Sequence, residues 1–219
     1  MKKLITLFLA LCATQAFGAI QVESSRVIYL GEYKSASLNV HNAAKKNYIV
    51  QTWLDDDASN RNKVMVVTPP LLKLLPDQSA VLRFIYSGTG LPTDRESVIW
   101  INVQEIPPRA SEPNVMQLAV RTRLKLFYRP ASLKTTLQSE VDKLKIEKNS
   151  DTLVVNNNGP LHISLSQLIV RNAQGLQKKI SAPMISPFSS QTLNFSKGSK
   201  IVGLTYINDH GGVADVKID

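Results

Sequence analysis

Cysteine is almost absent from this chain of 219 residues. The single cysteine, Cys12, lies in the apolar stretch near the start of the sequence, so the rest of the chain has no thiol. Disulfides, thiolate nucleophiles and cysteine zinc sites are therefore excluded from everything after that stretch. Without disulfides the chain must be stabilised by burial of apolar side chains, which two domains of ordinary size can supply.

Long apolar runs are absent as well. The run Leu4 to Ala13 is far shorter than the roughly 20 residues that span a bilayer, and no later run approaches that length. It follows two lysines and precedes small residues at Ala16 and Gly18, which is the pattern of a secretory signal peptide cleaved before Ala19. We therefore expect residues 1–18 to be a signal peptide and the mature protein to be exported.

Motifs of catalysis and metal binding are also missing. The three histidines, His41, His162 and His210, do not stand at metal-ligand spacings, and neither G-x-S-x-G nor a glycine-rich phosphate loop is found. The sequence Asp209 to Gly212, D-H-G-G, is typical of a tight turn rather than of an oxyanion hole. We expect no enzymatic activity, no metal and no cofactor.

The charge balance is positive, with 26 Lys and Arg against 17 Asp and Glu and a formal net charge of +9 at pH 7. Export argues against nucleic acid as the target of this charge. An acidic partner, an anionic membrane surface and simple solubility are the remaining alternatives.

No segment repeats its apolar residues with a sustained helical period, whereas short alternating runs recur between Pro, Gly and Asn turns. About seven such runs lie between Ile20 and Pro130, as in an immunoglobulin-like sandwich. A second, smaller set follows from Thr135 to Asp219. We predict an all-β chain of two sandwich domains, residues 19–133 and 134–219, joined by a hinge at Ala131 to Lys134.

The clearest alternation lies in Asn114 to Pro130, N-V-M-Q-L-A-V-R-T-R-L-K-L-F-Y-R-P, which we predict to be one strand with two unlike faces. The less polar face carries Met116, Leu118, Val120, Thr122 and Leu124, and the basic face carries Arg121, Arg123 and Lys125. The pattern permits two interpretations. The strand is half-buried with a solvated basic face, or its apolar row is presented to another protein.

Two cations stand out because the sandwich would bring them close together. Arg26 interrupts the first strand and Lys125 lies near the end of the seventh, and such edge strands can be neighbours. As solvated or salt-bridged cations they would contribute about 0–1 kcal/mol each to stability, and the residues alone favour this interpretation. An anion site between the domains would instead form charge-assisted hydrogen bonds of roughly 1.5–3 kcal/mol each.

Seven short motifs, taken together and in order, closely resemble those of periplasmic pilus-assembly chaperones, the PapD-like family. The resemblance covers essentially the whole mature chain. The motifs are T-P-P (Thr68 to Pro70), L-P-T-D-R-E-S (Leu91 to Ser97), I-P-P (Ile106 to Pro108), N-V-M-Q-L-A-V (Asn114 to Val120), L-K-L-F-Y-R-P (Leu124 to Pro130), P-F-S (Pro187 to Ser189) and Y-I-N-D-H-G-G (Tyr206 to Gly212), with Asn102 between the second and the third.

The resemblance implies two immunoglobulin-like domains set in an L or boomerang, with the binding cleft between them. It implies a periplasmic chaperone that binds, folds and caps pilus subunits by donor-strand complementation and delivers them to the outer-membrane usher. The expected partners are pilins, an adhesin and the usher, not nucleic acid. Reversible self-association is a further expectation, because an apolar edge that serves a partner can also pair with a second copy.

The resemblance also assigns three groups of site residues, and each position has the residue type that the family requires. The groups are the anchor for the C-terminal carboxylate of a subunit (Arg26 and Lys125), the donor-strand hydrophobics (Met116, Leu118 and Val120) and an inter-domain charge network (Glu96, Arg129 and Asp209). The short loop Arg109 to Pro113 resembles the class that serves rod-like pili. The second domain departs from some members by having no cysteines.

Two other classes of protein remain as alternatives. A structural pilus or adhesin subunit would share the export signal and the β-content, but would show its own polymerisation strand and often a disulfide. A periplasmic ligand-binding module for a carbohydrate or an anion would bind its ligand while ignoring pilin C-terminal peptides.

Overall fold

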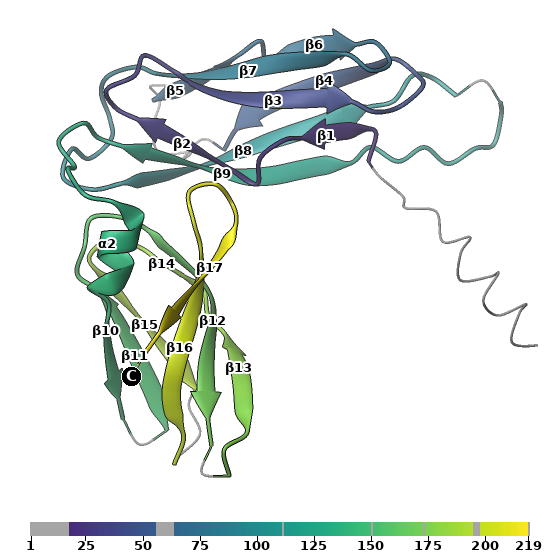
Figure 1. Cartoon of the computed structure of the whole chain (residues 1–219). Coiled ribbons are helices and arrows are strands. Elements are labelled where there is room, and N and C mark those ends of the chain that lie inside the picture. Colours follow the sequence, from purple (N-terminus) through teal and green to yellow (C-terminus); the bar gives the residue numbers. More distant parts are fainter. Residues whose placement is uncertain are drawn as a thin grey trace, which may run out of the picture.

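Two β-sandwiches follow one another along the chain, and their strands run in different directions, across the view in the first domain and down it in the second (Figure 1). The predicted all-β architecture of two domains arranged as an L is confirmed. The expected signal peptide lies outside the described residues except for Gly18. The computed structural model describes residues 18–55, 64–110, 112–149, 151–172, 174–194 and 198–218.

The N-terminal sandwich consists of a four-stranded and a five-stranded sheet. The first has the order β1 (Ile20–Val22), β3 (Ala36–Asn42), β7 (Ser79–Tyr86), β5 (Met65–Thr68). The second has the order β2 (Arg26–Leu30), β9 (Arg121–Arg129), β8 (Ser97–Ile106), β4 (Tyr48–Leu54), β6 (Leu71–Leu74). All these pairings are antiparallel except that of β2 with β9, which is parallel. That parallel pair faces the second domain and carries the two cations Arg26 and Lys125.

The core of this sandwich is formed by alternate residues of facing strands. Leu38 on β3 is the register partner of Leu82 on β7, and both side chains are buried, together with Phe84 two residues further on. On the opposite sheet Ile101 and Leu126 are completely buried. Alternation of this kind removes one face of each strand from water, which is the main stabilising term of the domain.

The C-terminal sandwich is built in the same way from shorter strands. One sheet has the order β10 (Lys145–Lys148), β11 (Thr152–Asn157), β15 (Ser189–Asn194). The other has the order β13 (Gln177–Ser181), β12 (Ile163–Arg171), β16 (Lys200–Ile207), β17 (Val213–Lys217), and β14 (Met184–Ile185) pairs with the start of β12. Its core is centred on Leu153, Leu161, Ile163, Leu168, Ile185 and Leu204.

A short helix, α2 (Leu137–Asp142), was not predicted. It begins after Thr136, whose hydroxyl accepts a hydrogen bond from the backbone N–H of Ser139, and its Leu137 and Val141 are buried. Six residues are too few to show a helical period in the sequence. Within the described residues, no helix has the length and apolar character needed to cross a bilayer.

The strand that was predicted from Asn114 begins only at Arg121. Its last pair with β8 is Gln104 with Arg121, and one further hydrogen bond joins the N–H of Glu105 to the carbonyl of Val120. No described strand lies beside the residues before Val120, so the alternating sequence continues there without a ladder. The predicted end of the strand at Arg129 is confirmed.

Truncation of Leu82 tests the assignment of the core. We expect Leu82→Ala to lower the free energy of unfolding by about 2–5 kcal/mol, because it leaves a cavity at a fully buried position. The neighbouring Val81 is 44% exposed on the same strand, so Val81→Ala is the matched control, with a loss of less than about 1 kcal/mol. Urea denaturation measures both, and equal losses would contradict the assignment.

Candidate functional site

The structure brings Arg26 and Lys125 together. In the parallel pair of β2 with β9 they are register partners, so their side chains leave the sheet on the same face. The neighbours Val27 and Leu124 are buried in the N-terminal core, which leaves the two cations on the face turned toward the second domain. A parallel pairing that the sequence could only suggest therefore creates a pair of adjacent positive charges.

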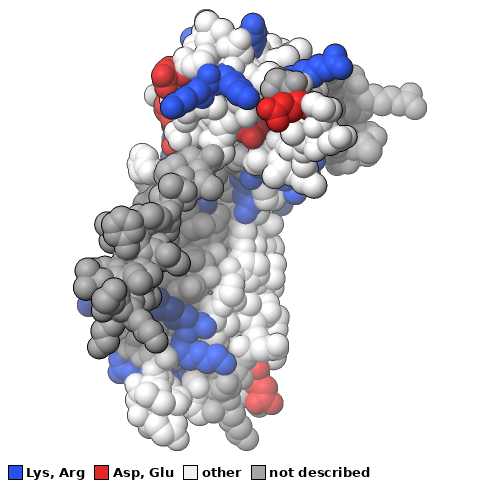
Figure 2. Space-filling model, turned by 90° about the vertical axis from the view of Figure 1, so that its right-hand side faces the viewer, with Lys and Arg blue, Asp and Glu red and all other residues white. Residues whose placement is uncertain are grey.

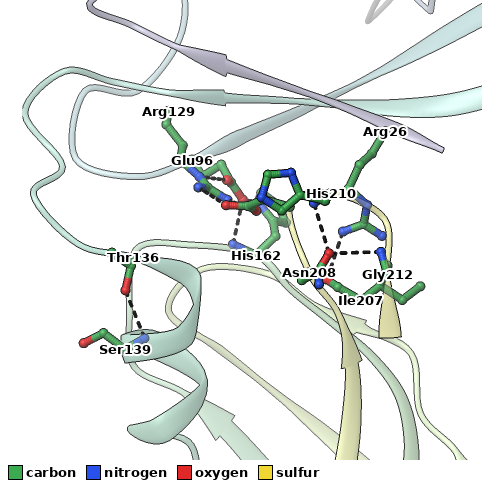
Figure 3. Close-up of polar contacts among 11 residues, drawn as sticks. Arg26, Glu96, Arg129, Thr136, Ser139, His162, Ile207, Asn208, His210 and Gly212 are labelled. Atoms are coloured by element: carbon green, nitrogen blue, oxygen red, sulfur yellow. Dashed lines mark hydrogen bonds and ion pairs between the residues drawn. The ribbon is translucent and has the colours of Figure 1, made fainter. Parts of the chain in front are cut away.

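Arg26 also contacts the second domain directly. Its Nη1 donates a hydrogen bond of 3.1 Å to the backbone carbonyl of Ile207 at the end of β16 (Figure 3). The guanidinium lies over the ring of Phe127, 5.5 Å from its centroid. Its Nε is buried and has no hydrogen-bond partner among the described residues. Arg26 is thus held at the domain junction with part of its donor capacity unused.

Neither cation forms an ion pair with any described residue, although both are partly withdrawn from water. Burial lowers the pKa of Lys125, and the nearby charge of Arg26 lowers it further. Burial likewise lowers the pKa of Arg26, against the opposing charges of Asp209 and Glu96. Figure 2 shows Lys and Arg side chains at the level where the two domains meet. An anion bound here would stabilise both cations.

The three candidate donor residues are exposed. Met116, Leu118 and Val120 have 88%, 74% and 48% of their surface accessible, unlike Leu124 and Leu126 further along the chain, which are buried. The three residues precede β9 and lie outside its ladder. The row of alternate apolar residues therefore passes from the core of the domain to its surface without a change of pattern.

The structure also brings Glu96, Arg129 and Asp209 together, across the two domains. Arg129 donates from Nε to Glu96 at 2.6 Å and from Nη1 and Nη2 to the two carboxylate oxygens of Asp209 at 2.7 and 2.6 Å. The side chain of Glu96 is completely buried and that of Arg129 is 11% exposed. Burial alone would lower the pKa of Arg129, but the hydrogen bonds to Asp209 and the charge of Glu96 outweigh it, so the pKa is raised.

His162 belongs to the same network and was missed by sequence reasoning, which considered histidines only as metal ligands. Its backbone N–H and its Nδ1 lie 2.8 and 2.9 Å from the second carboxylate oxygen of Glu96 (Figure 3). Its ring packs against Phe127 of the first domain, with centroids 5.7 Å apart. No sequence signal marks it, because its acidic partner belongs to the other domain.

A tight turn, as predicted for Asp209 to Gly212, places Asp209 within reach of Arg129. The side-chain oxygen of Asn208 accepts hydrogen bonds from the N–H groups of His210 and Gly212 (Figure 3). Gly211 has a positive φ of 85° and lies so near Ser25 that a Cβ would come within 2.3 Å of the Ser25 hydroxyl. The turn therefore requires glycine both for its backbone conformation and for its close approach to the first domain.

The domain junction also contains an open cavity of about 530 Å³, lined by residues of both domains that include Glu96, Trp100 and His162. Two further charged residues of its lining are Arg95, which pairs with Asp94, and Asp55, which pairs with Arg123. Within the described residues no group of His, Cys, Asp and Glu side chains is placed to hold a metal ion. Arg26 and Lys125 lie outside this lining and, among the described residues, have no ion-pair partner.

Removal of Arg129 should unlock the two domains. We expect Arg129→Ala to destabilise the protein by about 3–5 kcal/mol, because it leaves the buried carboxylate of Glu96 without its main partner. Small-angle scattering should show a broader distribution of domain orientations. Arg83→Ala is the control, since that arginine is exposed on β7, forms no ion pair among the described residues and should matter little. Unchanged stability and scattering of Arg129→Ala would refute the locking role.

Comparisons with known proteins agree with this architecture. Residues 19–134 match the family model of the N-terminal domain of PapD, described as a pili and flagellar-assembly chaperone, and residues 139–217 match the model of the PapD C-terminal domain, described as a pili assembly chaperone. The probable fimbrial chaperone LpfB of Escherichia coli O157:H7 is 38% identical, over 98% of this chain and 94% of its own length.

Solved structures show the same relationship. The YadV chaperone is 32% identical with a TM-score of 0.77, over 92% of this chain and 100% of that one. A chain of the complex of the SafA pilin with the SafB chaperone of Salmonella enterica is 27% identical with a TM-score of 0.76, over 94% of this chain and 99% of that one. The chain belongs to the PapD-like family of pilus-assembly chaperones.

Proposed function

We propose that this pilus-assembly chaperone captures its subunits by lending them the segment from Asn114 to Leu124 as a missing strand. The observation that carries the proposal is the exposed apolar row of Met116, Leu118 and Val120, which precedes β9 without a neighbouring strand among the described residues. An extended segment of this kind can add to the open edge of a partner sheet and supply backbone hydrogen bonds and apolar side chains together.

The apolar row would supply most of the affinity. Burial of each of its three side chains in the groove of a subunit would contribute on the order of 1.5–3 kcal/mol. The charge-assisted hydrogen bonds from Arg26 and Lys125 would contribute roughly 1.5–3 kcal/mol each, and part of that is spent on desolvating the carboxylate. The three apolar residues together therefore outweigh the two cations.

The cations would set the register. A slip of one residue along an added strand turns every side chain to the opposite face. Fixing the C-terminal carboxylate of the subunit at Arg26 and Lys125, which lie on the same strand pair as the end of the donor segment, excludes that slip. The anchor thus determines which side chain of the chaperone enters which part of the groove.

The setting of this activity follows the family. We place the protein in the periplasm, with pilins and an adhesin as the captured subunits and the outer-membrane usher as the recipient. The complex of SafA pilin with the SafB chaperone, in which a similar chain accompanies a pilin, supports the choice of partner.

The proposed boundary between the two domains lies between residues 133 and 134. The side chain of Leu133 already packs at the edge of the C-terminal core.

An exposed apolar edge is a hazard in the free protein, because it can pair with any other open strand. The exposed Arg121 and Arg123, which follow the apolar row directly, would act as gatekeepers against such pairing. Reversible pairing of two chaperone copies through the same row is consistent with this arrangement.

The anchor is tested by Arg26→Ala and Lys125→Ala, each coexpressed with a subunit encoded beside the chaperone gene. We expect the subunit to be degraded and its co-purification with the chaperone to fall at least tenfold, because its carboxylate is no longer held. Lys145→Ala, at an exposed position of β10, is the control and should capture subunits normally. Normal capture by both anchor variants would refute the anchoring role.

The donor role is tested by Leu118→Glu. A carboxylate at this position would have to enter the apolar groove of the subunit, so we expect capture to be lost while the free chaperone keeps its stability. The control is Leu176→Glu, since Leu176 is 69% exposed, close to the 74% of Leu118, but lies in the other domain. If the Leu118 variant captures subunits as the wild type does, the exposed row is not the donor segment.

A further inference from the structure

Arg26, Lys125 and Trp100 form one row across three neighbouring strands. Arg26 on β2 is the register partner of Lys125 on β9, which is the register partner of Trp100 on β8. The row continues to Asp55, whose backbone N–H donates a hydrogen bond of 2.9 Å to the carbonyl of Trp100. Register partners project from the same face of a sheet, so the cleft-facing surface carries two cations, an aromatic ring and an acid side by side.

The indole ring of Trp100 lies beneath two cations. The guanidinium of Arg123 is 4.1 Å from the ring centroid and the ammonium of Lys125 is 5.2 Å from it. The negative face of an aromatic ring attracts cations at such distances, and more strongly where water is partly excluded. Trp100 is only half-buried and is not part of the N-terminal core, so packing in that core does not account for its position.

The two cations on this ring differ in their other contacts. Arg123 donates from Nε and Nη2 to one carboxylate oxygen of Asp55, and the other oxygen accepts a bond of 2.6 Å from Asn102. The hydrogen bond from Arg123 holds the pKa of the Asp55 carboxyl below its ordinary value. Among the described residues Lys125 has no such acidic partner. Asp55 therefore neutralises Arg123 and leaves Lys125 charged.

A ring and a carboxylate hold a cation in different ways. A carboxylate beside Lys125 would neutralise it and would compete with any incoming anion. An aromatic ring attracts the ammonium through its quadrupole but carries no net charge, so the full positive charge stays available. An aromatic ring can therefore position a cation for an anionic ligand without neutralising it, which an acidic side chain cannot do.

We propose that Trp100 is a positioning residue of the carboxylate anchor: its ring face fixes the ammonium of Lys125 toward the cleft, while Asp55 removes Arg123 from competition for the same carboxylate. The inference rests on the proposed anchoring role of Arg26 and Lys125 and extends it to a residue of the neighbouring strand. The ligand remains the C-terminal carboxylate of a pilus subunit.

The experiment measures how strongly the full chaperone prefers a free carboxylate. The probe is a synthetic peptide with the last residues of a subunit encoded beside the chaperone gene, made once with a free C-terminal carboxylate and once with an amide. The ratio of the two dissociation constants gives the preference. We expect Trp100→Leu to reduce this ratio by about two- to tenfold and Trp100→Phe, which keeps a ring, to retain most of it. Trp53→Leu is the control, because Trp53 is also half-buried on this sheet, at the register position of Asn102.

Fluorinated tryptophan tests the same point without a change of shape, in case Trp100→Leu fails to fold. The chain has two tryptophans, so a Trp53→Phe background leaves Trp100 as the labelled residue. Added fluorine atoms withdraw electrons from the ring face and weaken its attraction for a cation. We expect the carboxylate preference to fall stepwise with each fluorine, which a purely structural role would not produce.

The outcomes separate this inference from the proposed function. If the wild type shows no carboxylate preference, or if Arg26→Ala and Lys125→Ala both retain it, the anchor itself is refuted. If Lys125→Ala alone retains it, the role of Lys125 is refuted, and that of Trp100 with it. If Lys125→Ala abolishes the preference but the fluorinated ring or Trp100→Leu leaves it unchanged, only the role of Trp100 is refuted. If Trp100→Phe loses as much as Trp100→Leu, the residue acts by its shape and the inference is overturned.

Discussion

The contact of Arg129 with Glu96 and Asp209 determines how the two sandwiches meet, and the rest of the site depends on that geometry. Buried ion pairs add little net stability, because the loss of hydration offsets most of the attraction. They are strict about geometry, however, since a bidentate arginine holds both partners in a single arrangement. Glu96 also accepts two hydrogen bonds from His162, so the first domain is tied to two separate points of the second. These contacts are the reason why we expect a single angle between the two domains.

Two other cations close to this contact, Arg26 and Lys125, form no ion pair among the described residues. Arg129 is surrounded by carboxylates, whereas Arg26 and Lys125, on the same strand pair, have none among the described residues. The same short stretch of β9 thus carries one cation with two carboxylate partners, Arg129, and one without a carboxylate partner among the described residues, Lys125. Opposite Arg129 the second domain places the carboxylate of Asp209, whereas opposite Arg26 it places the backbone carbonyl of Ile207.

Much of this could be predicted from the sequence, because alternation and motif order are local properties. The two-faced character of the stretch around β9, its end at Arg129 and the turn at Asp209 follow from residue types alone. The start of the strand could not be predicted, since it depends on where the pairing of β9 with β8 ends, at Arg121 and Gln104. His162 was not predicted for a similar reason, because its contact with Glu96 forms only when the second domain packs against the first. Helix α2 was missed because one capped turn leaves no period in the sequence.

The position where pairing stops is itself informative about function. If the ladder of β9 with β8 continued to Asn114, the apolar row would be part of an ordinary edge strand and its backbone would be satisfied on one side. Because pairing with β8 ends at Arg121 and the carbonyl of Val120, the residues before Val120 have no strand partner in the described protein, and Met116 and Leu118 are exposed. Exposed apolar side chains are unfavourable in water, and a subunit that lacks a strand would bury them while pairing the backbone groups of the segment. The segment that is exposed in the free protein is therefore the one that we propose for capture, with Arg26 and Lys125 as the proposed anchor of its register.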